Sequence, residues 1–162
     1  MFRIGFGFDT HRLEAGRDFR LGGILIQHSK GAAGHSDADV LIHAICDALL
    51  GAAGLRDIGY HFPDTSPEFK DIDSKILLQK THNLIREQSF SIQNIDSTIV
   101  LQNPKISPYI PEMIRVLSAI LELPENCVSV KAKTSETLGF IGREEGLSVY
   151  AIVLLSEGSG QV

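Results

Sequence analysis

Apolar residues recur at helical intervals in three parts of the chain, which are therefore predicted to be α-helices. The predicted helices span residues 36–51, about 73–88 and about 108–123. Pro108 and Pro111 fit the start of the third helix, because proline is tolerated in a first turn and not in a helix interior. The buried positions that the spacing predicts in the first two helices are Val40, Leu41, Ala44, Ile45, Ala48, Ile76, Leu77, Leu84 and Ile85.

Capping residues mark both ends of the first predicted helix. Ser36 is expected to be its N-cap, with Asp39 as the capping-box partner three residues later. Gly51 stands where a helix C-terminal glycine is expected. Residues 31–34 are expected to form a flexible loop that leads into this helix.

The remaining apolar segments predict strands. They lie at residues 2–9, 91–102, 127–133 and 147–156, with a short hairpin at 18–27 that turns at Gly22-Gly23. The strands at 91–102 and 147–156 have apolar residues on both faces, so both faces need cover. We therefore expect an α+β fold, a mixed sheet with helices packed on one face and another subunit against the other.

Composition restricts the class of protein. The 162 residues fit one domain, 1–162, and no repeat or linker divides them. The net charge of −5 argues against a nucleic acid or an anionic membrane as the main partner. Cys46 and Cys127 form no paired motif, and the N-terminal residues do not have the pattern of a signal peptide, so we expect a cytoplasmic protein.

Three residues are candidates for a metal site. Asp9 and His11 are two apart on an extended segment, so their side chains point the same way, and His43 in the first helix can supply a third ligand. One carboxylate and two imidazoles suit Zn²⁺ with a fourth position open for substrate. Asp39 or Asp47, one turn either side of His43, can accept a hydrogen bond from its second ring nitrogen. The alternative is a capped loop and a core histidine.

Four other segments have residues suited to binding a phosphate, a polyol or a nucleotide base. The segment 34–37 is expected at a helix start, where unsatisfied N–H groups favour an anion and His35 and Ser36 add donors, although Ser36 alone can be a cap. The carboxylates of the loop 56–65 can bind hydroxyls or merely cap turns. The strand end 131–136 can bind a diphosphate with a divalent cation, or be a solvated charged loop. The backbone of 101–106 can contact a base edge.

Together these segments resemble the 2-C-methyl-D-erythritol 2,4-cyclodiphosphate synthase family over essentially the whole chain. The matching blocks, in chain order, are Gly5-Phe6-Gly7-Phe8-Asp9-Thr10-His11, Gly34-His35-Ser36-Asp37-Ala38-Asp39-Val40 through His43 to Asp47-Ala48-Leu49-Leu50-Gly51, Asp57-Ile58-Gly59, Phe62-Pro63-Asp64-Thr65, Pro104-Lys105, and Glu136 through Gly139-Phe140 to Arg143. Three residues depart from the resemblance: Ala38, where this family usually has glycine, Ser66, where an aspartate is common, and Lys133, where some members have threonine.

The resemblance implies a reaction in isoprenoid precursor synthesis by the non-mevalonate pathway. The 2-phosphate of 4-diphosphocytidyl-2-C-methyl-D-erythritol 2-phosphate attacks the β-phosphorus, and CMP leaves as the cyclic diphosphate forms. The enzyme class is a phosphorus–oxygen lyase. By the family pattern Asp9, His11 and His43 bind Zn²⁺, and Glu136 helps to hold Mg²⁺ or Mn²⁺ at the substrate diphosphate.

The resemblance also implies the substrate contacts. His35 and Ser36 contact the 2-phosphate, and His35 and Thr134 position groups in the transition state. The remaining contacts that it implies are Asp57, Gly59 and Asp64 to the erythritol, Thr134 and Ser135 near the α-phosphate, and residues 101–106, including Lys105, around the cytosine.

The resemblance further implies a homotrimer with active sites between subunits and the sheets facing the threefold axis. An axial cavity can hold an isoprenoid diphosphate, with Phe140 and Arg143 beside it, although Arg143 can equally form a salt bridge between subunits with Glu144 or Glu145. Two other functions stay open. One is a metal-dependent phosphohydrolase, and the other is a non-catalytic trimeric protein that binds a metal or an isoprenoid.

Overall fold

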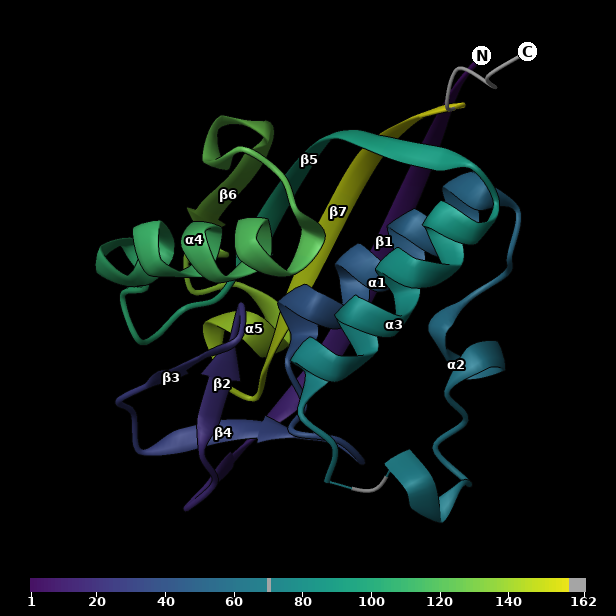
Figure 1. Ribbon diagram of the computed structural model, residues 1–162. Coiled ribbons are helices and arrows are strands. Elements are labelled where there is room, and N and C mark those ends of the chain that lie inside the picture. Colours follow the sequence, from purple (N-terminus) through teal and green to yellow (C-terminus); the bar gives the residue numbers. More distant parts are fainter. Residues whose placement is uncertain (70, 158–162) are drawn as a thin grey trace, which may run out of the picture.

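The computed structural model describes residues 1–69 and 71–157, which form one mixed sheet with helices on one of its faces (Figure 1). The five strands of this sheet lie in the order β4-β1-β7-β5-β6. Their bounds are β1 Phe2–Ala15, β4 Lys30–Ala33, β5 Phe90–Val100, β6 Val128–Lys133 and β7 Gly146–Glu157. β5 and β6 are parallel and the other neighbours are antiparallel. The predicted α+β class is confirmed.

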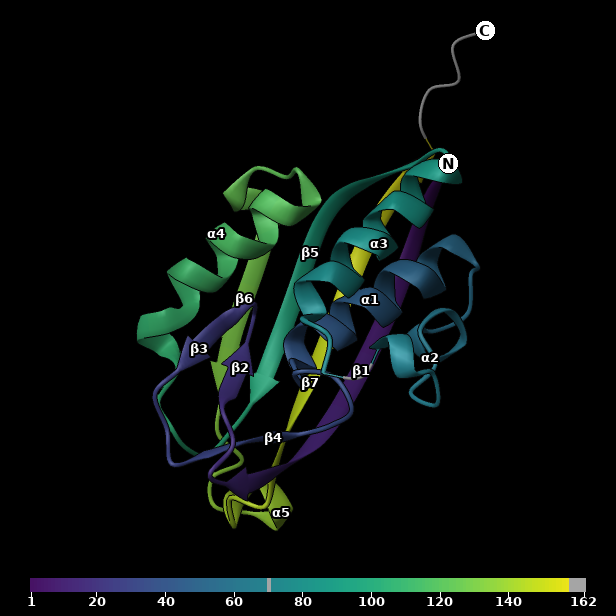
Figure 2. The same cartoon turned by 60° about the horizontal axis from the view of Figure 1, so that its bottom comes forward.

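The longer helices all lie on the same face of the sheet, as the two views show (Figures 1 and 2). They are α1 Val40–Ala53, α3 Ser74–Glu87 and α4 Ile110–Leu121. Shorter elements connect them: the hairpin β2 Phe19–Leu21 and β3 Ile24–Ile26, the helical turns α2 Ile58–His61 and α5 Gly139–Gly142, and 3-10 turns at Pro67–Phe69, Ser107–Tyr109 and Glu125–Cys127. None of the helices in the described ranges is long and apolar enough to cross a membrane.

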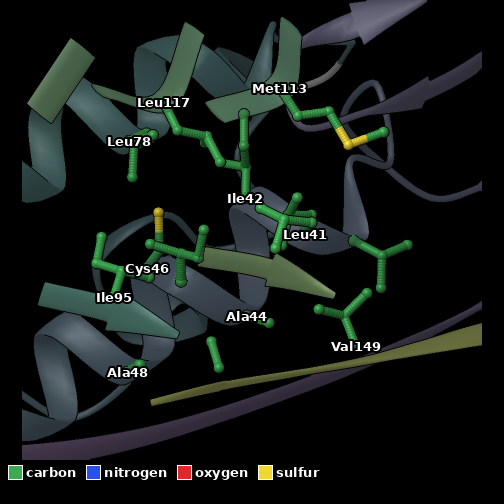
Figure 3. Close-up of a cluster of buried hydrophobic side chains, with 14 of the residues drawn as sticks. Leu41, Ile42, Ala44, Cys46, Ala48, Leu78, Ile95, Met113, Leu117 and Val149 are labelled. Carbon is green, nitrogen blue, oxygen red and sulfur yellow. The ribbon is translucent and has the colours of Figure 1, made fainter. Parts of the chain in front are cut away.

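The core lies between these helices and the sheet (Figure 3). α1 lies at its centre, and eleven of its residues are buried. Two glycines of β1 let α1 approach closely, because a Cβ on Gly5 would lie 1.8 Å from the Ala48 carbonyl oxygen and one on Gly7 would lie 1.9 Å from that of Ala44. This close contact places the middle of α1 directly above β1, where Asp9 and His11 continue the same row.

The described residues leave the opposite face of the sheet uncovered in the single chain (Figures 1 and 2). Along β1 and β7 it carries a row of large apolar side chains that are 42–74% exposed: Phe2, Ile4, Phe6, Phe8, Tyr150 and Ile152. Phe6 and Phe8 pair across the strands with Ile152 and Tyr150, so the row is continuous. For the strand predicted at 147–156, now β7, this row is the second apolar face. On β5 the same face carries Asp96 and Thr98 beside Ile152 and Tyr150, so it is polar at these positions, contrary to the prediction for 91–102.

The ends of several elements differ from the predictions. Residues 31–33 are not a loop but belong to β4, which pairs with the long β1, itself extending to Ala15. α1 begins at Val40 with Asp39, not Ser36, as its N-cap, and it ends at Ala53 with Gly54, not Gly51, as its C-terminal glycine. Ile76, predicted to be buried, is 48% exposed.

Asp39 explains why α1 begins where it does. Its carboxylate accepts N–H bonds from Ile42 in α1 and from Gly22 and Gly23 in the β2–β3 turn, at 3.1, 2.9 and 2.6 Å. Both glycines have positive φ, 64° and 78°, which suits glycine. The buried carboxylate thus joins the hairpin to the helix, a long-range contact that local capping patterns do not contain.

Candidate active site

Asp9, His11 and His43 meet at one point between β1 and α1. Oδ2 of Asp9 lies 3.0 Å from Nε2 of His11 and 3.0 Å from Nδ1 of His43. The potential ligand atoms of the three residues all lie within 4.8 Å of one another. Each of the three side chains is less than a quarter exposed. The predicted cluster is therefore brought together, by strand alternation for the first pair and by the Gly5 and Gly7 contact for the third residue.

Neighbouring groups orient both imidazoles towards Asp9. The Nδ1 atom of His11 lies 2.6 Å from the carbonyl oxygen of Ala33. A carbonyl oxygen only accepts, so Nδ1 donates and, in the neutral ring, Nε2 presents its lone pair to the cluster. His43 contacts Ser36 and Ser74 through Nε2, at 3.1 and 3.0 Å, which leaves Nδ1 for the cluster.

The electrostatics of the cluster favour a cation. Burial alone would raise the pKa of the Asp9 carboxyl, but the hydrogen bonds and charges of His11 and His43 outweigh burial and hold this pKa well below its usual range. Burial alone would lower the pKa of His11, yet the hydrogen bond and charge of Asp9 and the Ala33 carbonyl raise it. An anionic oxygen and two imidazole nitrogens converging on one point are a donor set that fits Zn²⁺.

A cavity of about 450 Å³ opens beside this cluster. Polar and apolar side chains from β1, α1, α2, α3 and the connecting loops line it: Asp9, His11, Gly34, His35, Ser36, His43, Asp47, Ile58, Gly59, Phe62, Asp64, Phe69, Ile72 and Leu77. His35, Ser36, Gly59 and Asp64, predicted to contact substrate, thus line the same cavity as the metal candidates. Asp57 instead caps α2 through the Tyr60 N–H, 2.8 Å away, at a position just before Gly59.

The predicted supporting role of Asp39 and Asp47 for His43 is wrong. Asp39 is occupied by three backbone N–H groups at the start of α1, and Asp47 accepts the Ile58 N–H at 2.8 Å. Ser36 and Ser74 occupy that position at His43 instead. The helix-dipole argument for residues 34–37 also fails, because α1 starts three residues later.

Ala38 shows the backbone reason for the family's usual glycine. Its φ is 58°, in the left-handed region where a Cβ is disfavoured. The turn in this region still forms, with the Ala38 N–H donating to Ser36 Oγ at 3.1 Å. Alanine, the smallest side chain after glycine, is thus accommodated here and leaves the metal candidates in place.

The C-terminal candidates form a second group, away from the cavity. The Thr134 hydroxyl donates to Glu136, whose φ is 52°, and the Ser135 hydroxyl donates to the Leu138 carbonyl. Two hydrogen bonds join this loop to the predicted cytosine segment: the Leu101 N–H donates to the Lys133 carbonyl, and the Thr137 N–H donates to the side-chain oxygen Oε1 of Gln102. Lys105 is exposed within that segment.

Phe140 and Arg143 lie beyond this loop, in and after α5. Phe140 is 41% exposed. The Arg143 guanidinium is paired with the Glu145 carboxylate through two hydrogen bonds of 3.0 and 2.9 Å. Arg143 therefore forms a salt bridge with Glu145 of its own chain, whereas the predicted alternative was a salt bridge between subunits, which stays a prediction.

Sequence reasoning missed Gly34, Asp37 and Ser74. A Cβ on Gly34 would lie 2.7 Å from Cε1 of His11, so the glycine is required by the closeness of the ring. Ser74 is fully buried at the first position of α3 and donates to Asp37. Ser74 lies at the start of the helix predicted at about 73–88, and that position alone does not indicate a contact with a histidine.

Comparison with known proteins places the chain in a family. The YgbB family model matches residues 2–156. A 2-C-methyl-D-erythritol 2,4-cyclodiphosphate synthase of Porphyromonas gingivalis is 59% identical over 95% of both chains. A solved 2C-methyl-D-erythritol-2,4-cyclodiphosphate synthase in its CDP-bound form has a TM-score of 0.88 and 38% identity, over 95% of this chain and all of that one. A Plasmodium falciparum IspF–CDP complex has a TM-score of 0.86 and 35% identity, over 98% and 97%. This chain belongs to the YgbB family, the family of the 2-C-methyl-D-erythritol 2,4-cyclodiphosphate synthases.

Proposed function

We propose that this protein cyclises 4-diphosphocytidyl-2-C-methyl-D-erythritol 2-phosphate to 2-C-methyl-D-erythritol 2,4-cyclodiphosphate. An oxygen of the 2-phosphate forms a bond to the β-phosphorus, the bond between that phosphorus and the bridging oxygen breaks, and CMP leaves with that oxygen. No water is consumed, so the reaction is that of a phosphorus–oxygen lyase. The observation that carries the proposal is the Asp9, His11 and His43 cluster beside the 450 Å³ cavity in a chain of this family.

The cavity residues suit the positioning that this reaction needs. The nucleophile is already an anion, so alignment and charge neutralisation contribute more than a strong base. His35 and Ser36, which line the cavity beside the cluster, are proposed to hold the 2-phosphate. Gly59 and Asp64, which also line the cavity, are proposed to hold the erythritol hydroxyls, together with Asp57 two residues before Gly59. Asp9, His11 and His43 would hold Zn²⁺, and Glu136 would contribute to holding Mg²⁺ or Mn²⁺. When bound, these ions supply charge neutralisation at the phosphate oxygens.

The second group of residues is proposed to bind the nucleotide half of the substrate. Thr134 and Ser135 would contact the α-phosphate, with Thr134 positioning it for departure, and residues 101–106 with Lys105 would surround the cytosine. Support comes from the hydrogen bonds that hold these two segments side by side, and from the solved relatives whose titles name CDP.

The separation of the two groups supports active sites formed between subunits. Asp9 on β1 aligns with Val149 on β7, Ile99 on β5 and Ala132 on β6, three strand steps across the sheet. At the usual strand spacing these steps amount to about 14 Å. A neighbouring copy can bring its own nucleotide-binding loop to this cavity. We propose a homotrimer whose uncovered apolar faces pack around the threefold axis.

An isoprenoid diphosphate in the resulting axial cavity is a separate part of the proposal. Phe140 supplies an exposed apolar surface, and Arg143 supplies a guanidinium. Because Arg143 is already paired with Glu145, a bound diphosphate would have to compete with that carboxylate. Native mass spectrometry of the purified oligomer tests this point, and finding no bound diphosphate would contradict it.

One assay distinguishes the three candidate functions. The protein is incubated with the cytidylyl substrate and Mg²⁺, and the products are followed by phosphorus NMR. Cyclic diphosphate and CMP in equal amounts are expected. Open-chain phosphates would indicate the metal-dependent phosphohydrolase, and no turnover by the zinc-loaded oligomer would indicate a protein that only binds a metal or an isoprenoid. His43→Ala, lacking one ligand of the cluster, is the negative control.

A further inference from the structure

The ring nitrogen of His43 that faces away from Asp9 contacts a buried hydroxyl group from another helix. Its Nε2 atom lies 3.0 Å from Oγ of Ser74, the first residue of α3. Ser74 is fully buried, and its hydroxyl in turn donates to Oδ1 of Asp37. The Asp37 backbone N–H donates to the Ile72 carbonyl, so the carboxylate is anchored beside the start of α3. Asp37, Ser74 and His43 thus form one chain of hydrogen bonds that leads to Asp9.

The direction of these hydrogen bonds determines which nitrogen of His43 carries its proton. A carboxylate has only acceptor atoms, so the single proton of Ser74 is used by Asp37. The Ser74 oxygen then presents a lone pair to Nε2, and Nε2 must be the donor. The neutral ring therefore has its free lone pair on Nδ1, the atom that lies 3.0 Å from Asp9 Oδ2. This is the tautomer that a metal at the cluster requires.

We propose that Ser74 and Asp37 are positioning residues that fix the tautomer and ring orientation of His43 for metal binding. The inference rests on the proposed metal role of Asp9, His11 and His43. Neither Ser74 nor Asp37 lines the cavity, so they act through His43 and not on the substrate.

A simple capping role does not account for Ser74. The N-cap of α3 is Asp73, whose side chain accepts the Lys75 N–H at 2.9 Å. The other hydroxyl near Nε2 differs as well, because Ser36 accepts the Ala38 N–H and lines the cavity, where a substrate can reach it. Only the Ser74 hydroxyl is both fully buried and fixed in direction by a carboxylate.

The test uses the full-length protein and zinc alone as the probe. Ser74→Ala removes the acceptor for Nε2–H and is expected to weaken zinc binding by about 10- to 100-fold, measured by competition with a chromophoric chelator. Ser74→Thr keeps the hydroxyl and is expected to restore most of the affinity. Ser118→Ala is the matched control: it removes a buried hydroxyl of α4 that has no hydrogen-bond partner among the described residues, and it should leave zinc affinity unchanged.

Cobalt supplies a readout that a loss of stability does not mimic. The visible absorption of the Co²⁺-loaded protein reports ligand geometry, and its band positions are expected to change in Ser74→Ala but not in Ser118→Ala.

Asp37→Ala gives an independent variant should Ser74→Ala not fold. It frees the Ser74 proton to point at Nε2, which favours the wrong tautomer, and zinc affinity should again fall.

Two different failures can be told apart. If the unmodified protein binds no zinc, the proposed metal centre itself is wrong. If it binds zinc but Ser74→Ala and Asp37→Ala bind equally well, within about twofold, with unchanged cobalt spectra, then the positioning role is overturned while the proposed function stands.

Discussion

At the scale of single residues, the fit between Gly34 and His11 leads to the first prediction. A Cβ at position 34 would lie 2.7 Å from Cε1 and 2.9 Å from Nδ1 of the His11 ring. Gly34→Ala should therefore displace the imidazole from the Ala33 carbonyl and lower zinc affinity by about tenfold or more, as loss of an orienting contact does at other metal sites. Chelator competition measures the effect.

Gly51→Ala is the matched control for this change. Gly51 lies inside α1, and nothing is within 4 Å of a Cβ built there. Zinc affinity should be unchanged, and the free energy of unfolding should rise by about 0.5–1 kcal/mol, because alanine favours the helix. Equal zinc affinities for Gly34→Ala and Gly51→Ala would show that the His11 ring tolerates displacement.

The pH dependence of zinc binding is the second prediction. Despite burial, the hydrogen bond and charge of Asp9 raise the pKa of His11 above its ordinary value of 6.5, whereas the pKa of Asp9 is lowered. A proton on His11 must leave before a metal binds, so zinc affinity should fall as pH drops through the raised pKa, by up to about tenfold per pH unit for each proton released. Isothermal titration between pH 6 and 8 in buffers of different ionisation enthalpy measures the protons. A flat profile would contradict the prediction.

The same residues show how far sequence could predict the site. Asp9 and His11 were predictable because strand alternation puts residues two apart on one face. His43 was predictable as the third ligand because it is a histidine in the middle of the first predicted helix. Ser74 and Asp37 were not, because they come from separate segments and their roles depend on which atom of a third residue they contact. Nothing in the spacing distinguishes a serine that only starts a helix from one that also orients a histidine.

At the scale of elements, the Asp39 side chain connects the β2–β3 hairpin to α1 by hydrogen bonds. Its two carboxylate oxygens accept from Gly22, Gly23 and Ile42. In Asp39→Asn one oxygen becomes an NH₂ group that faces an N–H donor. Leaving that buried donor unsatisfied should lower the free energy of unfolding by about 1–3 kcal/mol, measured by urea denaturation.

Asp37→Asn provides the comparison for this third prediction. It makes the same chemical change two residues away, where the carboxylate is only partly buried and accepts from no hairpin N–H. Its loss of stability should be smaller than that of Asp39→Asn. If Asp37→Asn lost more stability than Asp39→Asn, the hydrogen bonds between Asp39 and the hairpin would contribute little to the free energy of unfolding.

This join also explains why the ends of α1 could not be predicted correctly. The capping-box pattern at Ser36 is local, whereas the N-cap is decided by a carboxylate that binds a hairpin about sixteen residues upstream. The body of the helix was predictable because apolar spacing reflects burial directly. β4 was missed for a similar reason: a short strand of small residues has little pattern of its own and forms because it pairs with the end of β1.

At the scale of the whole molecule, the uncovered sheet face and the divided site point to the same assembly. The face carries a row of exposed apolar residues, and a contiguous apolar patch of this kind marks an interaction surface. The metal candidates lie within one chain, but the residues proposed for the nucleotide lie three strands away. Zinc binding should therefore not require the oligomer, whereas cyclisation should require it. A substitution that prevents oligomer formation should abolish cyclisation and leave zinc binding intact.

Ile4→Asp is the substitution that separates them. Ile4 lies in the exposed row of β1, 74% exposed in the single chain, so an aspartate there would be buried without a partner in a trimer. The variant should sediment as a monomer in analytical ultracentrifugation, lose cyclisation, and still bind zinc through Asp9, His11 and His43.

Ile76→Asp, at a 48% exposed position of α3 on the helical face, is the control and should remain trimeric and active. A monomeric Ile4→Asp protein that still releases CMP would show that one chain contains a complete active site. A trimeric, active variant would show that this face is not the interface.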